Sequence, residues 1–126
     1  MKTILVIEDN EQNLYLVTFI LEKSGYHVVP ARDGVEGIEL ACKTNPALIL
    51  LDIQLPLMDG YAVARELRKS PALADVPIVA VTSYAMTGDR EQAFAAGCTG
   101  HIEKPINPAT FLQDIEQYLE RREDPS

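Results

Sequence analysis

The stretch Leu48-Ile49-Leu50-Leu51-Asp52 decides the fold, because four apolar residues in a row are followed at once by a carboxylate. A strand that is apolar at every position is covered on both faces, as in a parallel sheet with helices on either side. Two similar runs, Ile4 to Ile7 and Ile78 to Val81, also lead into polar residues. We therefore predict that these three strands form the centre of a parallel sheet.

Segments of helical period separate the apolar runs, and this alternation is typical of an α/β protein with a doubly wound sheet. Gly25 and Gly97 are placed to end helices, and Asn107-Pro108 is placed to begin one. The expected strands are Thr3 to Ile7, a weak His27 to Val29, Ala47 to Leu51, Pro77 to Val81 and Gly100 to Glu103. The expected helices are Glu11 to Ser24, Gly34 to Thr44, Tyr61 to Ser70, Asp89 to Ala96 and Pro108 to Arg121.

The composition limits the function. The chain has 126 residues, enough for one domain, and its 47% hydrophobic and 24% charged residues exclude a disordered chain. Eleven Lys and Arg against nineteen Asp and Glu give a net charge of −8, which repels nucleic acids and anionic membranes. No apolar run is long enough for a membrane span, so we expect a cytoplasmic protein. Cys42 and Cys98 are expected to be reduced and mostly buried thiols.

Polar residues whose side chains could bind a ligand or take part in a reaction follow four of the expected strands. Glu8 and Asp9 follow the first strand, and Asp52 ends the third. Thr82 ends the fourth strand, and Lys104 follows the fifth. Successive parallel strands joined by right-handed crossovers end at the same edge, where open α/β sheets bind ligands. We therefore expect three carboxylates, a hydroxyl and an ammonium in one shallow pocket.

This combination of charges indicates a metal ion and a phosphoryl group. Two carboxylates about 5 Å apart repel by about 3 kcal/mol at an effective dielectric near 20, so three of them need a cation, and Mg²⁺ suits an open oxygen site. Asp52 could then act as a nucleophile toward phosphorus, with Lys104 and Thr82 holding the phosphoryl oxygens. No histidine or second free carboxylate is placed to drive hydrolysis. We expect a phosphoryl acceptor with slow turnover rather than an enzyme.

Four motifs occur in a characteristic order: Glu8-Asp9, Asp52 to Gly60, Val81-Thr82 and Lys104-Pro105. Together they resemble the receiver domain of two-component response regulators, from Lys2 to about Arg121. The resemblance implies a flavodoxin-like fold of five parallel strands in the order 2-1-3-4-5. It also implies a receiver domain at residues 1–121 and a short charged tail at residues 122–126.

The same resemblance implies a role for each site residue. Asp52 would be phosphorylated by a histidine kinase or a histidine phosphotransferase in a Mg²⁺-dependent phosphorelay. Thr82 and Lys104 would bind the phosphoryl group, and the Lys104-Pro105 peptide would be cis. The implied metal contacts are Asp9, Asp52, the backbone carbonyl of Gln54 and, through water, Glu8.

One position departs from the family pattern. His101 stands where these domains usually have a Tyr or Phe that responds to Thr82, so it is either a switch residue or a partly exposed histidine of an edge strand. The output surface implied by the family is the face of the fourth helix, fifth strand and fifth helix, which would bind a downstream protein or, on phosphorylation, a second copy. Gln54 and Tyr84 would flank the attacking water, and Tyr84 is expected to shield the phosphoryl group.

Other classes of protein fit the residues less well. A haloacid-dehalogenase type of enzyme needs a second Asp two residues after the nucleophile, where this chain has Gln54. A flavodoxin-like nucleotide carrier needs a phosphate loop, which Glu8-Asp9-Asn10 would repel. A fourth class is a receiver-shaped protein that signals only by binding a partner, without phosphorylation. Treatment with acetyl phosphate would distinguish it from a phosphoryl acceptor. The first strand begins near Met1, which favours a natural N-terminus; a stand-alone regulator, a relay intermediate and a piece of a hybrid kinase all stay open.

Overall fold

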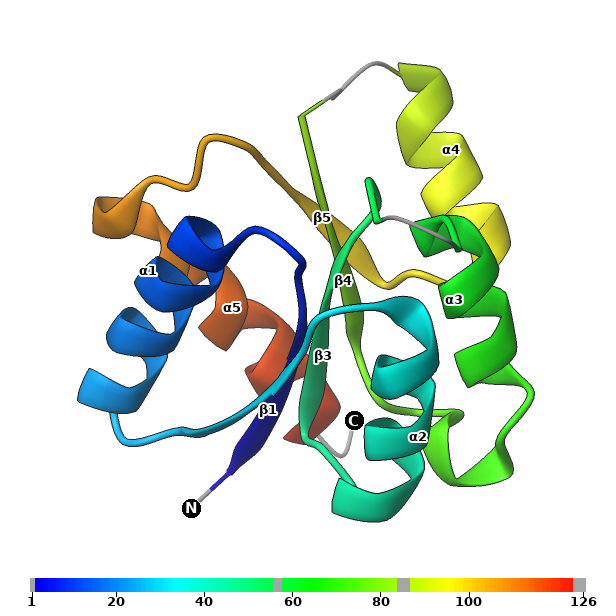
Figure 1. Ribbon diagram of the computed structural model, residues 1–126, viewed down its shortest axis with the longest axis horizontal. Coiled ribbons are helices and arrows are strands. Elements are labelled where there is room, and N and C mark those ends of the chain that lie inside the picture. The colour runs from blue at the N-terminus through cyan, green and yellow to red at the C-terminus, as the bar shows by residue number, and fades with distance from the viewer. Residues whose placement is uncertain (1, 56–57, 84–86, 124–126) are drawn as a thin grey trace.

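The computed structural model describes residues 2–55, 58–83 and 87–123, and it contains one five-stranded sheet (Figure 1). Its strands are Thr3–Ile7 (β1), His27–Ala31 (β2), Leu48–Asp52 (β3), Ile78–Thr82 (β4) and Gly100–Glu103 (β5). All neighbouring strands are parallel, in the order β2-β1-β3-β4-β5. The three strands predicted for the centre of the sheet lie there, and the predicted fold class and strand order are confirmed.

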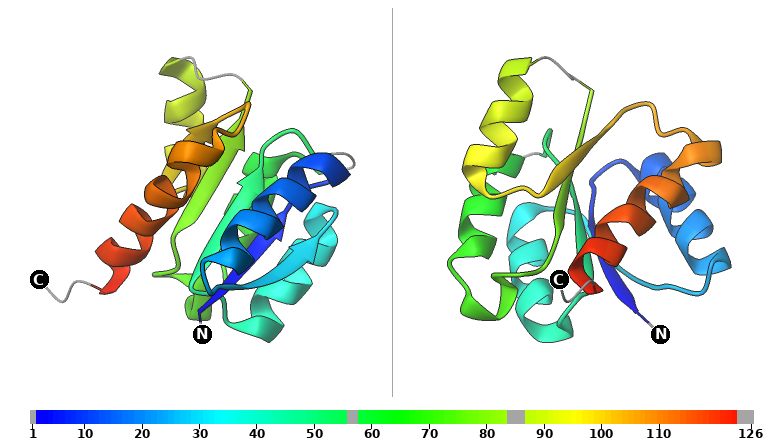
Figure 2. Two further views of the ribbon diagram at one scale, coloured as in Figure 1. Left: turned by 90° about the vertical axis from the view of Figure 1, so that its left-hand side faces the viewer. Right: turned by 180° about the vertical axis from the view of Figure 1, so that it is seen from behind.

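Helices cover both faces of the sheet. They span Glu11–Lys23 (α1), Gly34–Thr44 (α2), Gly60–Arg68 (α3), Thr87–Ala96 (α4) and Pro108–Glu123 (α5), and a short 3₁₀ helix spans Pro71–Leu73 (η1). Helices α1 and α5 lie on one face, and α2, α3 and α4 lie on the other (Figures 1 and 2). The sheet is therefore the middle layer of three.

The core explains why the central strands are apolar at every position. Leu48 and Leu50 of β3 pack into the cluster beneath α1 and α5, whereas Ile49 and Leu51 pack into the cluster beneath α2, α3 and α4. All five residues of β3 and all five of β4 are buried. Alternate side chains point to opposite faces, and here each face is a core.

Several boundaries differ from the sequence-based prediction. Strand β2 continues to Ala31 through Pro30, which an edge strand tolerates because one side of its backbone needs no partner strand. The 3₁₀ turn η1 was not predicted, and α5 continues to Glu123, two residues past its expected end. The predicted helix ends at Gly25 and Gly97 are confirmed, with φ angles of 94° and 107°.

The prediction of mostly buried cysteines is wrong for one of the two. Cys98 is buried, but Cys42 is exposed on α2. The buried face of that helix is made by Gly34, Gly37 and Ala41. Cys42 follows Ala41 directly and is turned by about 100° from it around the helix axis, which moves its side chain out of the core.

Candidate functional site

The sheet register brings the ends of the central strands to one edge. Ile7 of β1 is paired with Leu51 of β3, so Glu8 and Asp52 follow in matching positions. Backbone hydrogen bonds continue past the strands and hold the residues that follow them. The N–H of Glu8 donates to the Ala31 carbonyl at 2.9 Å, and the N–H of Lys104 donates to the Thr82 carbonyl at 2.8 Å.

Three carboxylates meet at this edge. One oxygen each of Glu8, Asp9 and Asp52 lies within 4.8 Å of the others. Glu8 and Asp52 are only 4% and 3% exposed, whereas Asp9 is exposed to solvent. A backbone N–H two residues along the chain fixes each buried carboxylate: Asn10 donates to Glu8 Oε2 at 3.2 Å, and Gln54 donates to Asp52 Oδ1 at 2.9 Å. Two of the carboxylates are thus held in place, and the third opens the cluster to solvent.

Lys104 is the cation of this cluster in the described part of the chain. Its Nζ lies 3.3 Å from Asp52 Oδ2 and 3.5 Å from Glu8 Oε1. With all three carboxylates ionised, the formal charge is −3 + 1 = −2, which a divalent cation would balance. Burial raises the pKa of Glu8 to about 7, and the neighbouring Asp52 adds to that shift.

These donors fit magnesium. Mg²⁺ takes oxygen ligands, is bound through few carboxylates and keeps several waters. The oxygens of the cluster are hard donors, and the exposed Asp9 leaves the cluster open on one side. The excess negative charge and the raised pKa of Glu8 both indicate a carboxylate cluster that a bound cation would stabilise.

The loop after Asp52 is closed by the Asp59-Gly60 pair. The N–H of Gly60 donates to the Ile53 carbonyl at 3.0 Å. A Cβ atom at Gly60 would lie 2.5 Å from the Cα of Ile53 and 2.8 Å from the carbonyl oxygen of Asp52, so only glycine allows this approach. Asp59 caps α3 by accepting from the N–H of Ala62 at 2.9 Å. These two motif residues therefore shape the site rather than line it.

His101 lies on β5 and is half-buried. With Thr82 of β4 and Arg90 of α4 it lines a small apolar cavity, which also touches Tyr61 of α3. Burial lowers the pKa of His101, and Arg90 lowers it further, while Glu103 opposes the shift. The cavity connects the end of β4, beside Asp52, with the outer strand of the sheet.

The sequence-based analysis missed some residues of this region. Asn10 caps α1, with its Oδ1 accepting from the Asn13 N–H at 3.0 Å, so Asp9 is not used as the cap. Arg90 and Tyr61 carry no local pattern that would place them beside His101. Gln54 lies two residues after the end of β3 and has an exposed side chain, and the Lys104-Pro105 peptide is cis as expected. Tyr84 lies outside the described residues.

The comparisons with known proteins agree with this geometry. The sequence model of the protein family described as the response regulator receiver domain matches residues 4–116 of this chain. The chain belongs to the receiver domain family of response regulators. This receiver domain is 41% identical over 118 residues to the polar-differentiation response regulator DivK of Brucella ovis, which covers 94% of this chain and 96% of the relative.

Solved structures of receiver domains have the same fold. Chemotaxis protein CheY4 of Vibrio cholerae superposes with a TM-score of 0.90 at 28% identity, covering 94% of this chain and 98% of the other. The receiver domain of the sensor histidine kinase PA1611 of Pseudomonas aeruginosa PAO1 superposes with a TM-score of 0.87 at 33% identity, with the same coverage. That structure holds a magnesium ion coordinated in its active site cleft.

Among residues 2–55, 58–83 and 87–123, no helix is both long enough and apolar enough to cross a membrane.

Proposed function

We propose that this receiver domain accepts a phosphoryl group on Asp52 from the phosphohistidine of a histidine kinase or a histidine phosphotransferase. An Asp52 carboxylate oxygen would attack phosphorus, the N–P bond of the donor would break, and its electron pair would stay with the departing imidazole. The observation that carries the proposal is the position of Asp52, which is buried among carboxylates with the Lys104 ammonium 3.3 Å away. An ammonium there can hold a phosphoryl oxygen as negative charge moves onto the acceptor.

The metal would be held by this chain's own oxygens. Asp9, Asp52 and the backbone carbonyl of Gln54 would bind Mg²⁺ directly, and Glu8 would bind it through water. Bound Mg²⁺ supplies positive charge against the phosphoryl oxygens. Glu8 would gain from that charge as well, because a nearby cation favours the ionised form of a carboxylate.

Thr82 and Lys104 would complete the phosphoryl site. Thr82 ends β4, the strand next to β3, and Lys104 follows β5, the next strand along. The Lys104 N–H donates to the Thr82 carbonyl and joins the two backbones. The hydroxyl and the ammonium would each take a phosphoryl oxygen. We infer slow phosphorylation and dephosphorylation by the domain itself, and a signalling role rather than turnover of a substrate.

The output would pass through the cavity that Thr82 shares with His101. When Thr82 moves toward the phosphoryl group, the ring of His101 can fill the vacated space, and this population shift would change the α4, β5 and α5 face offered to a downstream protein or a second phosphorylated copy. We further propose that residues 1–121 act as the receiver domain, although α5 itself continues to Glu123, and that the protein works in the cytoplasm without binding nucleic acid.

Intact mass spectrometry after incubation with acetyl phosphate and Mg²⁺ tests the acceptor role. The wild type should gain the mass of one phosphoryl group, and Asp52→Asn should gain none, because an amide is a poor nucleophile. Asp33→Asn is the matched control, since Asp33 caps α2 outside the carboxylate cluster, with its Oδ1 accepting from the Glu36 N–H at 2.8 Å, and asparagine is also a good cap. Full labelling of Asp52→Asn, or loss of labelling in Asp33→Asn with the fold intact, would refute the assignment.

A further inference from the structure

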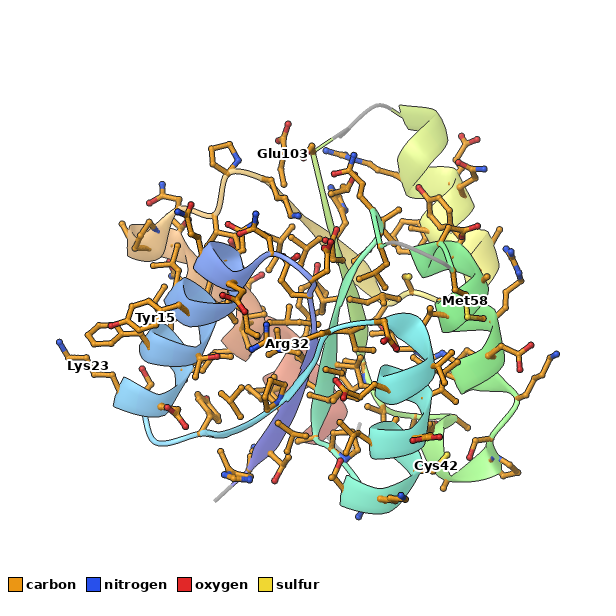
Figure 3. All side chains as sticks on the ribbon, in the orientation of Figure 1. Tyr15, Lys23, Arg32, Cys42, Met58 and Glu103 are labelled. Atoms are coloured by element: carbon orange, nitrogen blue, oxygen red, sulfur yellow. The ribbon has the colours of Figure 1, made fainter. Side chains whose placement is uncertain are left out.

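Helix α1 carries two aromatic side chains on its outer face, on the side of the molecule away from the sheet. Tyr15 is 73% exposed and Phe19 is 53% exposed. Their rings stack with centroids 6.5 Å apart, and the Lys23 ammonium lies 5.7 Å from the centroid of Phe19. Figure 3 shows Tyr15 and Lys23 pointing outward from α1. Exposed aromatic pairs of this kind mark contact surfaces more often than isolated apolar residues do.

These residues belong to one ridge with a specific order. Glu11, Tyr15, Phe19 and Lys23 are spaced by four residues, so they form a single i, i+4 row along α1. The row reads acidic, aromatic, aromatic, basic. Its centre is at position 17, since 11 and 23 as well as 15 and 19 are equidistant from it. When two copies of this row are aligned antiparallel, opposite charges therefore face each other at both ends, and aromatic rings face each other in the middle.

The ridge borders a groove that would widen such a contact. An open groove between α1 and β2 is lined by Leu14, Tyr15, Thr18 and Pro30, and the Glu11–Arg32 ion pair of 2.8 Å closes one end. The whole chain carries a net charge of −8, which opposes self-association. In the row and the groove, however, the charges of Glu11, Lys23 and Arg32 sum to −1 + 1 + 1 = +1, so the excess negative charge of the chain does not lie here.

We propose that the outer face of α1 is a self-association surface, on which two copies of the chain pair their α1 helices antiparallel about a twofold axis near position 17. Tyr15 of each copy then packs on Phe19 of the other copy, and Glu11 of each copy faces Lys23 of the other copy. A twofold contact uses the same patch on both partners, which is what the palindromic order of this ridge provides.

The size of the contact sets its strength. Helix α1 has 13 residues, so it is about 20 Å long, and one helix pair with its flanking groove lies at the low end of specific interfaces. The dimer is therefore weak and depends on concentration. It does not require phosphorylation, because none of its residues belongs to the carboxylate cluster.

Sedimentation equilibrium of the unphosphorylated protein over a range of concentrations tests the proposal. Wild type should form a reversible dimer. The single variants Glu11→Lys and Lys23→Glu should each raise the dissociation constant of the dimer at least tenfold, because like charges then face each other at both ends of the contact. An equimolar mixture of the two variants should dimerise again, since each heterodimer restores both pairs. A wild type that stays monomeric at the highest soluble concentration would overturn the proposal.

The double variant Glu11→Lys/Lys23→Glu separates the local pairing from the overall charge. Its net charge is −8 + 2 − 2 = −8, equal to that of the wild type, and its dimer should return. Phe19→Ser should abolish the dimer, whereas Phe94→Ser should leave it intact, because Phe94 is 55% exposed on α4, on the opposite face. Circular dichroism of every variant checks the fold. A dimer that Phe94→Ser removes and Phe19→Ser spares would place the contact elsewhere.

Discussion

The two ends of the central sheet both hold a cation, but they use it differently. At the amino end, Arg68 is the last residue of α3 and donates to backbone carbonyls of three segments. Its Nη1 bonds to Leu73 at 2.7 Å and to Val76 at 2.8 Å, and its Nε bonds to Gly97 at 2.8 Å. At the carboxyl end, Lys104 faces the carboxylates of Asp52 and Glu8 at 3.3 and 3.5 Å.

The difference lies in what balances each cation. Arg68 meets neutral carbonyl dipoles that the backbone already fixes, so its hydrogen bonds join η1, the entry to β4 and the end of α4 into one rigid unit. Lys104 meets an excess of carboxylates, and burial together with Asp52 raises the pKa of Glu8 to about 7. The amino end therefore serves stability, and the carboxyl end keeps unbalanced charge that a ligand can neutralise.

Among the substitutions at the two ends of the sheet, Arg68→Ala should have the largest effect. Removing the guanidinium leaves several part-buried carbonyls without their donor, which should lower the free energy of unfolding by about 3 kcal/mol or more. Urea denaturation measures the loss. Lys69→Ala is the control, because its ion pair with Glu66 is exposed and should matter by at most about 0.5 kcal/mol. Phosphoryl uptake in the cold should persist in Arg68→Ala; its loss in a folded variant would contradict the division of roles.

The two neighbouring acids should contribute unequally to metal binding. Asp9→Ala should weaken Mg²⁺ binding about tenfold or more, because it removes an inner ligand and a charge. Glu8→Ala should weaken it less near neutral pH, since with a pKa of about 7 Glu8 carries only part of its charge there. Isothermal titration at fixed ionic strength compares them. Equal losses would reject the inner and outer roles.

Lys104→Ala should separate metal binding from the conformational response. The variant should bind Mg²⁺ as well as the wild type or a few-fold tighter, because a repelling ammonium beside Asp52 is gone. Its phosphorylated and unphosphorylated forms should have nearly the same NMR spectra, since the phosphoryl oxygens lose their cationic partner. A wild-type spectral difference on phosphorylation would show that Lys104 does not couple the two.

The smallest effect is expected at His101. Its pKa is lowered mainly by burial and then by Arg90, so the folded chain binds the proton less readily than the unfolded chain. Stability from the neutral ring is therefore present above the unfolded value of 6.5 and is lost as pH falls through it. As the pH falls from about 7.5 to about 5.5, the free energy of unfolding of the wild type should fall relative to that of His101→Tyr in urea denaturation. Parallel stability curves would mean that the ring is only a surface residue.

The sequence predicts the carboxyl end of the sheet better than the amino end. Apolar runs such as Leu48 to Leu51 indicate strands that are buried on both faces of the sheet, and the polar residue that follows each run marks the end of the strand. The carboxylate cluster was predictable because it consists of such strand ends. The Arg68 network was not predictable, because its acceptors are backbone carbonyls, which every residue type has, so no residue in the sequence marks them. The cavity at His101 joins four elements and has no local pattern either.

The central claim is that Asp52 itself carries the phosphoryl group. Borohydride reduces an acyl phosphate to an alcohol and releases phosphate, so a phosphorylated aspartate becomes homoserine. Peptide mapping of the acetyl-phosphate-treated and reduced protein should find homoserine at position 52 and aspartate or glutamate unchanged at positions 8, 9 and 59. Homoserine absent from position 52, or the reduced product at Glu8 or Asp9 instead, would contradict the account.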